Sequence, residues 1–248
     1  MVNRHIFIGD IHGMSAALAA LIEKLAPDVG DRVVFLGDLV DKGPDAAGVV
    51  RMARQMKDEA AFETVLIEGN HEDLHARYRV NLAVRPTVAA EQEAGNGELV
   101  SLNAQLVPED VAFLESAVPF FRLDAHDILA VHGGIPGDML AFPTSLDEAL
   151  ELQGKHRRSF RKILRTRFVS ADTGAFLVQG HETAGDPFWA DSYDGRFGHV
   201  IFGHNPFMQG PAMFPFATGI DTGAVHGGAL TALVVDGNGR RTFVSVPC

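Results

Sequence analysis

Five short apolar runs, each closed by a glycine-containing polar motif, constrain the fold of this chain more than any other feature. They are HIFI before GDIHG, VVFL before GDLVDKG, TVLI before EGNHE, ILAV before HGG, and HVIF before GHN. Runs of about four residues rich in Val, Ile and Phe and ended by glycine are typical of buried strands. Each polar motif is therefore expected at the C-terminal end of a strand.

Helical patterns lie between these runs. Apolar residues at helical spacing follow Ser15, which we expect to cap one helix, and Pro44, which suits the first turn of another. Strands that alternate with helices predict an α/β fold, in which ligands bind at the C-terminal edge of the sheet. Residues 228–246 read as two strands joined by a Gly-Asn-Gly turn, an antiparallel hairpin that makes the predicted sheet mixed.

The remaining segments are expected to pack around this core and not to form a second domain. Residues 73–127 carry no sharp motif and are expected to form helical or irregular cover, with a short helix in VPEDVAFLESA and a flexible excursion over 86–98. No internal repeat or break in composition marks a linker. A single domain over residues 1–248 is the prediction.

Charge and cysteine content exclude several classes of protein. A formal net charge of −11 argues against general affinity for nucleic acid or an anionic membrane. No apolar run approaches the ~20 residues needed to span a bilayer, and the N-terminus carries no signal peptide. The single cysteine, Cys248, excludes an internal disulfide and makes a cysteine metal site implausible. We therefore expect a cytoplasmic protein.

One segment departs from the acidic average. Residues 154–168 hold seven of the 21 Lys and Arg residues, and apolar side chains recur there at helical spacing. This pattern predicts an amphipathic helix with one basic face. That face is either simply solvated or steers an anionic substrate towards the site.

Six oxygen or imidazole donors directly follow the apolar runs, and they are the candidate metal ligands: Asp10, His12, Asp38, Asn70, His132 and His204. One residue separates the first two, which in extended backbone turns both side chains the same way. Three histidines, two aspartates and one asparagine are too many for one tetrahedral zinc and suit two adjacent divalent ions.

Such a metal pair activates a bridging water and holds the oxygens of a phosphoryl group during in-line displacement. Because Asn70 is a neutral donor, the loaded site keeps a positive balance that attracts an anion. The mixed oxygen and nitrogen donors fit Mn²⁺, Fe or Zn²⁺, of which we expect Mn²⁺.

The ordered motifs GDIHG (9–13), GDLVDKG (37–43), GNHE (69–72), HGG (132–134) and FGHN (202–205) resemble those of the PPP-type calcineurin-like metallophosphoesterases. That family includes Ser/Thr phosphoprotein phosphatases and symmetrical diadenosine tetraphosphatases, and residues 219–233 resemble the closing strand block of its bacterial members. The resemblance implies a four-layer fold, in which two mixed β-sheets pack face to face between helices.

The resemblance also implies roles for single residues. Asp10 and His12 would bind the first metal and Asp38 would bridge to the second, which Asn70, His132 and His204 would complete. His71 would be the general acid that protonates the leaving oxygen, with Asp41 as its orienting carboxylate. A carboxylate beside an imidazole fixes its tautomer and favours its protonated form, which agrees with these roles.

Phosphate-binding groups are less sharply predicted. Lys42 stands where most protein phosphatases of the family carry arginine, so it supplies charge without a bidentate grip. A further arginine is expected between HGG and GHN, with Arg167 or Arg165 preferred and Arg196 as the second choice. His226 lies in the glycine-rich stretch 223–228, where it either touches substrate or is incidental.

The leading functional hypothesis is a dinuclear metal-dependent hydrolase of phosphorylated Ser or Thr in proteins. Hydrolysis of a dinucleoside polyphosphate such as diadenosine tetraphosphate, by symmetrical cleavage, is the alternative enzyme activity. A metal-binding interaction module without catalysis is a third possibility, against which the complete donor set argues. The sequence does not indicate an oligomeric state.

Overall fold

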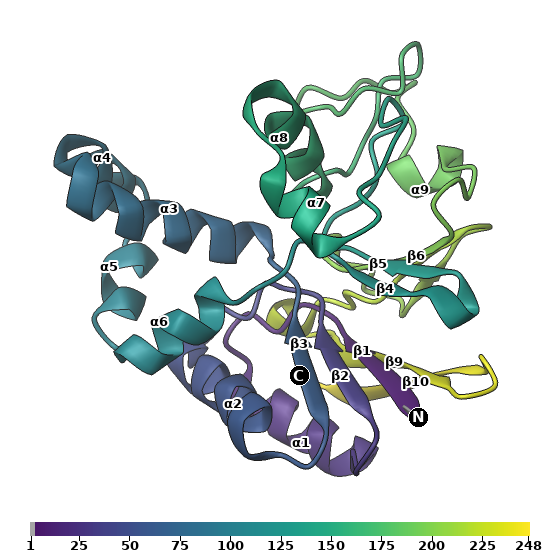
Figure 1. The fold of residues 1–248 in the computed structure, drawn as a ribbon. Coiled ribbons are helices and arrows are strands. Elements are labelled where there is room, and N and C mark those ends of the chain that lie inside the picture. Colours follow the sequence, from purple (N-terminus) through teal and green to yellow (C-terminus); the bar gives the residue numbers. More distant parts are fainter. Residues whose placement is uncertain (1–2) are drawn as a thin grey trace.

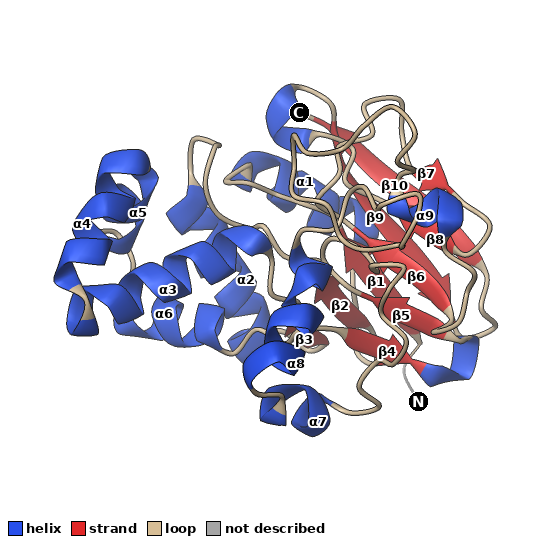
Figure 2. Ribbon diagram, turned by 90° about the horizontal axis from the view of Figure 1, so that it is seen from above, coloured by secondary structure: helices blue, strands red, loops and turns tan. Residues whose placement is uncertain are grey.

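The computed structural model describes residues 3–248, and its centre is a pair of five-stranded mixed sheets that stack face to face (Figures 1 and 2). The first sheet has the order β10-β9-β1-β2-β3, with bounds Arg241–Pro247, Ala229–Asp236, Arg4–Ile8, Arg32–Phe35 and Glu63–Leu66. The second has the order β4-β5-β6-β8-β7, with bounds Phe121–Leu123, Ile128–Ala130, His199–Phe202, Ala217–Gly219 and Ala212–Met213.

The five apolar runs form β1, β2, β3, β5 and β6, as predicted. Strands β1, β2 and β3 pair in parallel, as do β5, β6 and β8, so their C-terminal ends meet at common edges. Strands β9 and β10 form the predicted antiparallel hairpin, and β9 also pairs antiparallel with β1. The predicted mixed sheets are therefore confirmed.

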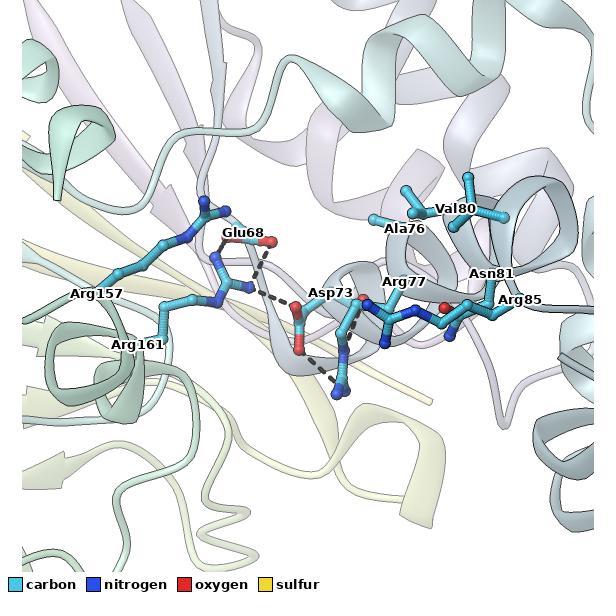
Figure 3. Close-up of a pocket in the computed structure, with 10 residues that line it drawn as sticks. Glu68, Asp73, Ala76, Arg77, Val80, Asn81, Arg85, Arg157 and Arg161 are labelled. Atoms are coloured by element: carbon cyan, nitrogen blue, oxygen red, sulfur yellow. Dashed lines mark hydrogen bonds and ion pairs between the residues drawn. The ribbon is translucent and has the colours of Figure 1, made fainter. Parts of the chain in front are cut away.

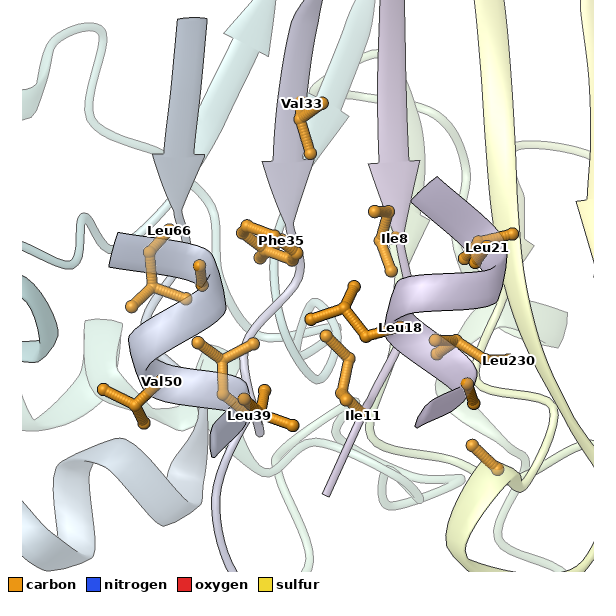
Figure 4. Packing of buried hydrophobic residues seen from close by; sticks show 14 of the residues in the cluster. Ile8, Ile11, Leu18, Leu21, Val33, Phe35, Leu39, Val50, Leu66 and Leu230 are labelled. Carbon is orange, nitrogen blue, oxygen red and sulfur yellow. The ribbon is translucent and has the colours of Figure 1, made fainter. Parts of the chain in front are cut away.

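Alternation along the strands explains why the runs are almost wholly apolar. In β1, Ile6 and Ile8 belong to the core beneath the helices, whereas Phe7 points to the core between the two sheets. In β2, Phe35 faces the helices and Val34 faces the second sheet. Both faces of these two strands are buried, which demands a continuous apolar sequence. Figure 4 shows the helix-facing side of this packing.

Helices complete four layers, which confirms the predicted arrangement (Figures 1 and 2). Helices α1 (Ser15–Leu25) and α2 (Ala46–Glu59) cover the first sheet, and α6 (Pro108–Glu115) packs on α2. The second sheet is covered by α7 (Leu146–Glu151), α8 (Gly154–Phe160) and α9 (Trp189–Ser192). Short turns are η1 (Asp124–His126), η2 (Arg161–Leu164) and η3 (Ala224–His226). Within residues 3–248, every helix is too short or too polar to span a bilayer.

Residues 86–98, expected to be a flexible excursion, are mostly helical instead. Helix α3 (Asn70–Val84) leads into α4 (Pro86–Gly95) and α5 (Glu98–Asn103), and together they form an arm at the side of the sheets (Figure 2). Pro86 starts α4, where its missing N–H costs no hydrogen bond. A small buried cluster of Tyr78, Ala89 and Leu99 ties the three helices together, which a reading of turn residues alone overlooks.

The predicted basic helix over 154–168 is shorter than expected. Helix α8 ends at Phe160 and η2 continues only to Leu164. The carbonyl of Ile163 accepts the N–H groups of Gly133 and Gly134, at 2.8 and 3.0 Å, and is therefore not available to a longer helix. The following residues are freed to enter the candidate site.

Candidate metal centre and active site

The six predicted donors lie in the loops that follow the parallel strands. They are Asp10 and His12 after β1, Asp38 after β2, Asn70 after β3, His132 after β5 and His204 after β6. Asp38 lies among them, with Oδ2 3.4 Å from His12 Nε2 and Oδ1 3.3 Å from His132 Nε2. Residues distant along the chain thus meet where the C-terminal ends of both sheets converge.

Two groups of donor atoms share Asp38. One contains His12, Asp38 and His71, the other contains Asp38, His132 and His204, and within each group the ligand atoms lie within 4.8 Å of one another. Asn70 Oδ1 lies 3.1 Å from His132 Nε2, beside the second group. A carboxylate common to two groups has the arrangement required of a ligand between two cations.

The imidazoles are held with a free nitrogen towards the cluster. His12 Nδ1 lies 2.7 Å from the carbonyl of Val40, and His132 Nδ1 lies 2.8 Å from that of Leu36. Because a carbonyl only accepts, each Nδ1 carries a proton, and Nε2 is the nitrogen that can bind a metal ion once it is deprotonated. Backbone carbonyls orient metal-binding histidines in this way, so the tautomers and the donor set both fit metal ions.

Charge at the cluster also favours a bound cation. Burial opposes ionisation of Asp38, but the adjacent imidazole of His132 holds the pKa of that carboxyl well below its usual range. Burial likewise lowers the pKa of His132, but Asp38 beside it dominates and raises it to about 10. The centre thus stabilises positive charge between its buried acid and imidazole groups.

Asp10 lies beside the two groups rather than within either. Both of its carboxylate oxygens accept the backbone N–H of His204, at 2.9 and 3.0 Å. Burial raises its pKa well above the usual value, with a further contribution from the negative charge of Asp221. A Cβ at Gly203 would overlap Asp10 Oδ1, so this close approach requires glycine.

The backbone of the site is strained. Of the seven non-glycine residues with positive φ among residues 3–248, five belong to these loops: His12, Asp38, Asp41, Lys42 and His204. Such conformations cost ~1–3 kcal/mol each and persist where surrounding contacts enforce them, commonly at functional sites. The concentration of strained residues in these loops therefore indicates a functional site.

Glu72 is one of those enforcing contacts, and its supporting role was not predicted. Its buried carboxylate accepts the backbone N–H groups of Asp38, Leu39 and Gly69, at 2.7, 2.8 and 2.9 Å. Its position as the third residue of α3, after Gly69, is the sequence signal for such a capping carboxylate. Glu72 ties the loop that carries Asp38 to the start of α3.

His71 and Asp41 form the predicted pair, with Nδ1 2.6 Å from Oδ2. Burial lowers the pKa of His71, but the hydrogen bond to Asp41 and the negative charges of Asp38 and Asp41 together outweigh it, and the net shift is upward. The opposite oxygen of Asp41 lies 2.7 Å from His75 Nε2, and Asn103 Nδ2 donates to His75 Nδ1 at 2.9 Å. Burial opposes ionisation of Asp41, but the hydrogen bonds from both imidazoles lower its pKa to about 2.

Neither His75 nor Asn103 was predicted from the sequence to belong to the site. The spacing of His71 and His75 by one helical turn was the only available indication of their shared partner. Their network fixes Asp41 from two sides.

Lys42, Arg167 and His226 line a cavity of about 130 Å³ together with Asp10, His12, His204 and the unpredicted Asp221. Lys42 Nζ lies 2.9 Å from His12 Nε2, and Arg167 Nε lies 3.2 Å from His204 Nε2. Two cations from distant segments therefore converge on the cluster, where they can contact an anion.

The other two predicted arginines lie elsewhere. Arg165 binds Asp73 at 2.7 Å and the backbone carbonyl of Asn70 at 3.3 Å, beside the centre but outside its cavity. Arg196 binds Asp194 at 2.8 Å and the carbonyl of Gly137 at 3.2 Å, and it does not line the cavity. Its carboxylate partner, Asp194, lies two residues away in the sequence, so the structure does not bring Arg196 together with Lys42 and Arg167.

Comparison with known proteins agrees with this geometry. Residues 4–208 match the calcineurin-like phosphoesterase family. The protein named bis(5'-nucleosyl)-tetraphosphatase PrpE [asymmetrical] of Halalkalibacterium halodurans is 30% identical, over 97% of this chain and 92% of that protein. The protein of the same name from Bacillus subtilis is 28% identical, over 90% of this chain and 87% of its own length.

Solved structures share the fold. A crystal structure described as a candidate diadenosine tetraphosphatase aligns with a TM-score of 0.70 and 26% identity, over 100% of this chain and 94% of that one. A Ser/Thr phosphatase from Saccharomyces cerevisiae aligns with a TM-score of 0.62 and 15% identity, over 100% of this chain and 80% of that one, a likeness of fold alone. The motifs, the two mixed sheets and the matched family agree, and the chain belongs to the calcineurin-like phosphoesterases, a family of metal-dependent hydrolases.

Proposed function

We propose that this protein hydrolyses dinucleoside tetraphosphates asymmetrically, to a nucleoside triphosphate and a nucleoside monophosphate. The observation that carries the proposal is the convergence of Lys42 and Arg167 on the candidate metal centre, because these two cations can donate charge-assisted hydrogen bonds to the oxygens of a polyphosphate. The names of the relatives from two bacteria support the same substrate class.

In this proposal, two divalent ions are held by Asp10, His12, Asp38, Asn70, His132 and His204. When bound, they polarise the phosphoryl oxygens and lower the pKa of the attacking water. Mn²⁺ is our proposed metal, with Fe and Zn²⁺ as the alternatives that the donor set also accepts.

The remaining steps belong to residues of the chain. Lys42 and Arg167 bind the phosphate oxygens and orient the anhydride for in-line attack. His71 donates its Nε2 proton to the leaving oxygen, and Asp41 holds the imidazole in the tautomer and protonation state that this step needs. The oxygen of water joins one phosphorus, and the bond from that phosphorus to the bridging oxygen breaks. The bridging oxygen leaves with the proton from His71, and the proton of the water passes to the solvent.

A phosphoserine or phosphothreonine phosphatase is the second candidate. It is favoured by the pairing of Asp41 with both His71 and His75, since an alkoxide leaving group needs a stronger proton donor than a phosphate does. Both activities would use the same centre, and they differ in the part of the substrate that lies outside it.

Side-by-side kinetics separate these activities. The Mn²⁺-loaded protein is assayed on diadenosine tetraphosphate and on a phosphoserine peptide, and the nucleotide products are identified by anion-exchange chromatography. We expect a higher kcat/KM for the tetraphosphate and equal amounts of ATP and AMP. ADP alone would establish symmetrical cleavage, and a preference for the peptide would support the second candidate.

Metal dependence has its own test. Metal-stripped protein should be inactive and should recover with Mn²⁺. An Asp38→Asn variant, which lacks the shared carboxylate, should not recover with the same metal. Absence of activity with Mn²⁺, Fe²⁺ and Zn²⁺ alike would reject an enzyme and leave a binding module.

A further inference from the structure

A second pocket lies beside the candidate metal centre, and nothing above assigns it. It has a volume of about 570 Å³. Arg157 of α8 and Arg161 of η2 form one wall, and Arg77, Val80 and Arg85 belong to the opposite wall along α3 and its C-terminal end (Figure 3). The pocket is large enough for a nucleotide-sized ligand.

Positive charge dominates this pocket although the whole chain carries a net charge of −11. Its two acids are already paired. Arg161 donates to both oxygens of Glu68, at 2.9 and 3.0 Å, and also binds Asp73. By contrast, neither Arg85 nor Arg157 has a hydrogen-bond or ion-pair partner for its guanidinium within residues 3–248.

A chain of hydrogen bonds connects the pocket to the centre. Glu68 lies two residues before the candidate ligand Asn70, and Arg165 donates to the backbone carbonyl of Asn70 at 3.3 Å. Asp73 then accepts Arg165 at 2.7 Å and Arg161 at 2.5 Å. Arg165 and Arg161 therefore connect the candidate ligand Asn70 to the pocket, where the guanidinium groups of Arg85 and Arg157 are free to bind phosphates.

The second wall also offers apolar surface. Ala76, Val80 and Val84 line it, and Val80 and Val84 are 59% and 65% exposed. A nucleobase can pack on such aliphatic side chains while a guanidinium stacks on its face, as arginine does on planar π-systems. Free cations beside an exposed apolar wall match a nucleoside phosphate, which carries both kinds of surface.

We infer that this pocket binds the distal end of the substrate, the nucleoside with its attached phosphates that leaves as the triphosphate. The inference rests on the proposed function and deepens it. Asymmetric cleavage divides the tetraphosphate into a one-phosphate and a three-phosphate half, and the longer half needs a cationic site at a distance from the reacting phosphorus. The pocket supplies that site, and Arg85 and Arg157 are its specificity determinants.

Glutamine variants of the two free arginines test the inference. Arg85→Gln and Arg157→Gln, singly and together, are assayed on diadenosine tetraphosphate and on 4-nitrophenyl phosphate, which is too short to reach the pocket. The ratio of kcat/KM on the two substrates should fall about tenfold for each lost charge contact. The matched control is Arg158→Gln, since Arg158 is also exposed on α8 but does not line the pocket, and its ratio should equal that of the wild type.

Binding of ATP to the Mn²⁺-loaded protein provides an independent readout by calorimetry. Its affinity should fall about tenfold in Arg157→Gln and stay unchanged in Arg158→Gln, and inorganic tripolyphosphate should bind more weakly than ATP. Wild-type affinity for ATP in the double variant overturns the inference, even where the proposed hydrolysis is found. Arginine-dependent ATP binding without hydrolysis of the tetraphosphate rejects the proposed function and upholds the pocket. If the double variant binds ATP as the wild type does but binds the phosphoserine peptide more weakly, a nucleotide is rejected as the ligand of the pocket.

Discussion

Replacement of Asp41 by asparagine tests the reasoning about the proposed acid most directly. Asp41 is buried, and hydrogen bonds from His71 and His75 outweigh its burial and lower its pKa from 3.8 to about 2. One pKa unit corresponds to ~1.4 kcal/mol, so the ionised carboxylate contributes on the order of 2–3 kcal/mol to the free energy of unfolding at neutral pH. We expect Asp41→Asn to lose about this amount.

The sign of its pH dependence follows from the depressed pKa. A group whose pKa is lower in the folded protein stabilises it above the unfolded pKa of 3.8, and this contribution disappears as the pH falls through about 2. Urea unfolding in the presence of a chelator should therefore show the full gap between wild type and variant near pH 5, below the range in which His71 titrates. The gap should narrow below pH 4. Asp172→Asn, at an exposed position, is the control and should show no gap.

Activity gives the second half of the same test. Without Asp41, the proton donor His71 loses both its orientation and the partner that raises its pKa. The kcat of the Mn²⁺-loaded variant on an alkyl phosphate should fall roughly 100-fold, and much less on 4-nitrophenyl phosphate, whose leaving group needs no proton. Equal losses on the two substrates would reject His71 as the general acid, and a gap in unfolding free energy independent of pH would refute the electrostatic argument.

Three further substitutions probe the frame of the centre. Gly203→Ala places a Cβ on Asp10 Oδ1, and we expect Mn²⁺ affinity, measured by titration, to fall about 10–100-fold; unchanged affinity would show that Asp10 is not a ligand. Glu72→Gln replaces a carboxylate that accepts three backbone N–H groups by an amide, one end of which can only donate. The free energy of unfolding in urea should therefore fall by roughly 2 kcal/mol. An unfolding curve with the same midpoint and slope as that of the wild type would contradict this expectation. Lys42→Arg introduces a planar fork, so the KM for 4-nitrophenyl phosphate should fall a few-fold, whereas a higher KM would mean that lysine is positioned for a different contact.

The fold and the candidate metal ligands were largely readable from sequence because they depend on local order. A buried strand needs a continuous apolar run, and a polar motif that ends such a run must emerge at the edge of the sheet. The five runs therefore predicted Asp10, Asp38 and His132 at the C-terminal ends of strands, where the structure has them. The segment 86–98 was predicted wrongly because its helix depends on packing against Tyr78 and Leu99 as much as on its own residues.

The tertiary structure alone decided which charged residues reach the centre. Arg165 and Arg167 are equivalent by sequence, and in extended backbone both would point the same way. Instead η2 ends where the glycines of the HGG motif capture the carbonyl of Ile163, and the two side chains separate, one to Asp73 and the other to His204. No local pattern records this outcome, because it depends on contacts between segments that meet only when both sheets and the helical arm have packed.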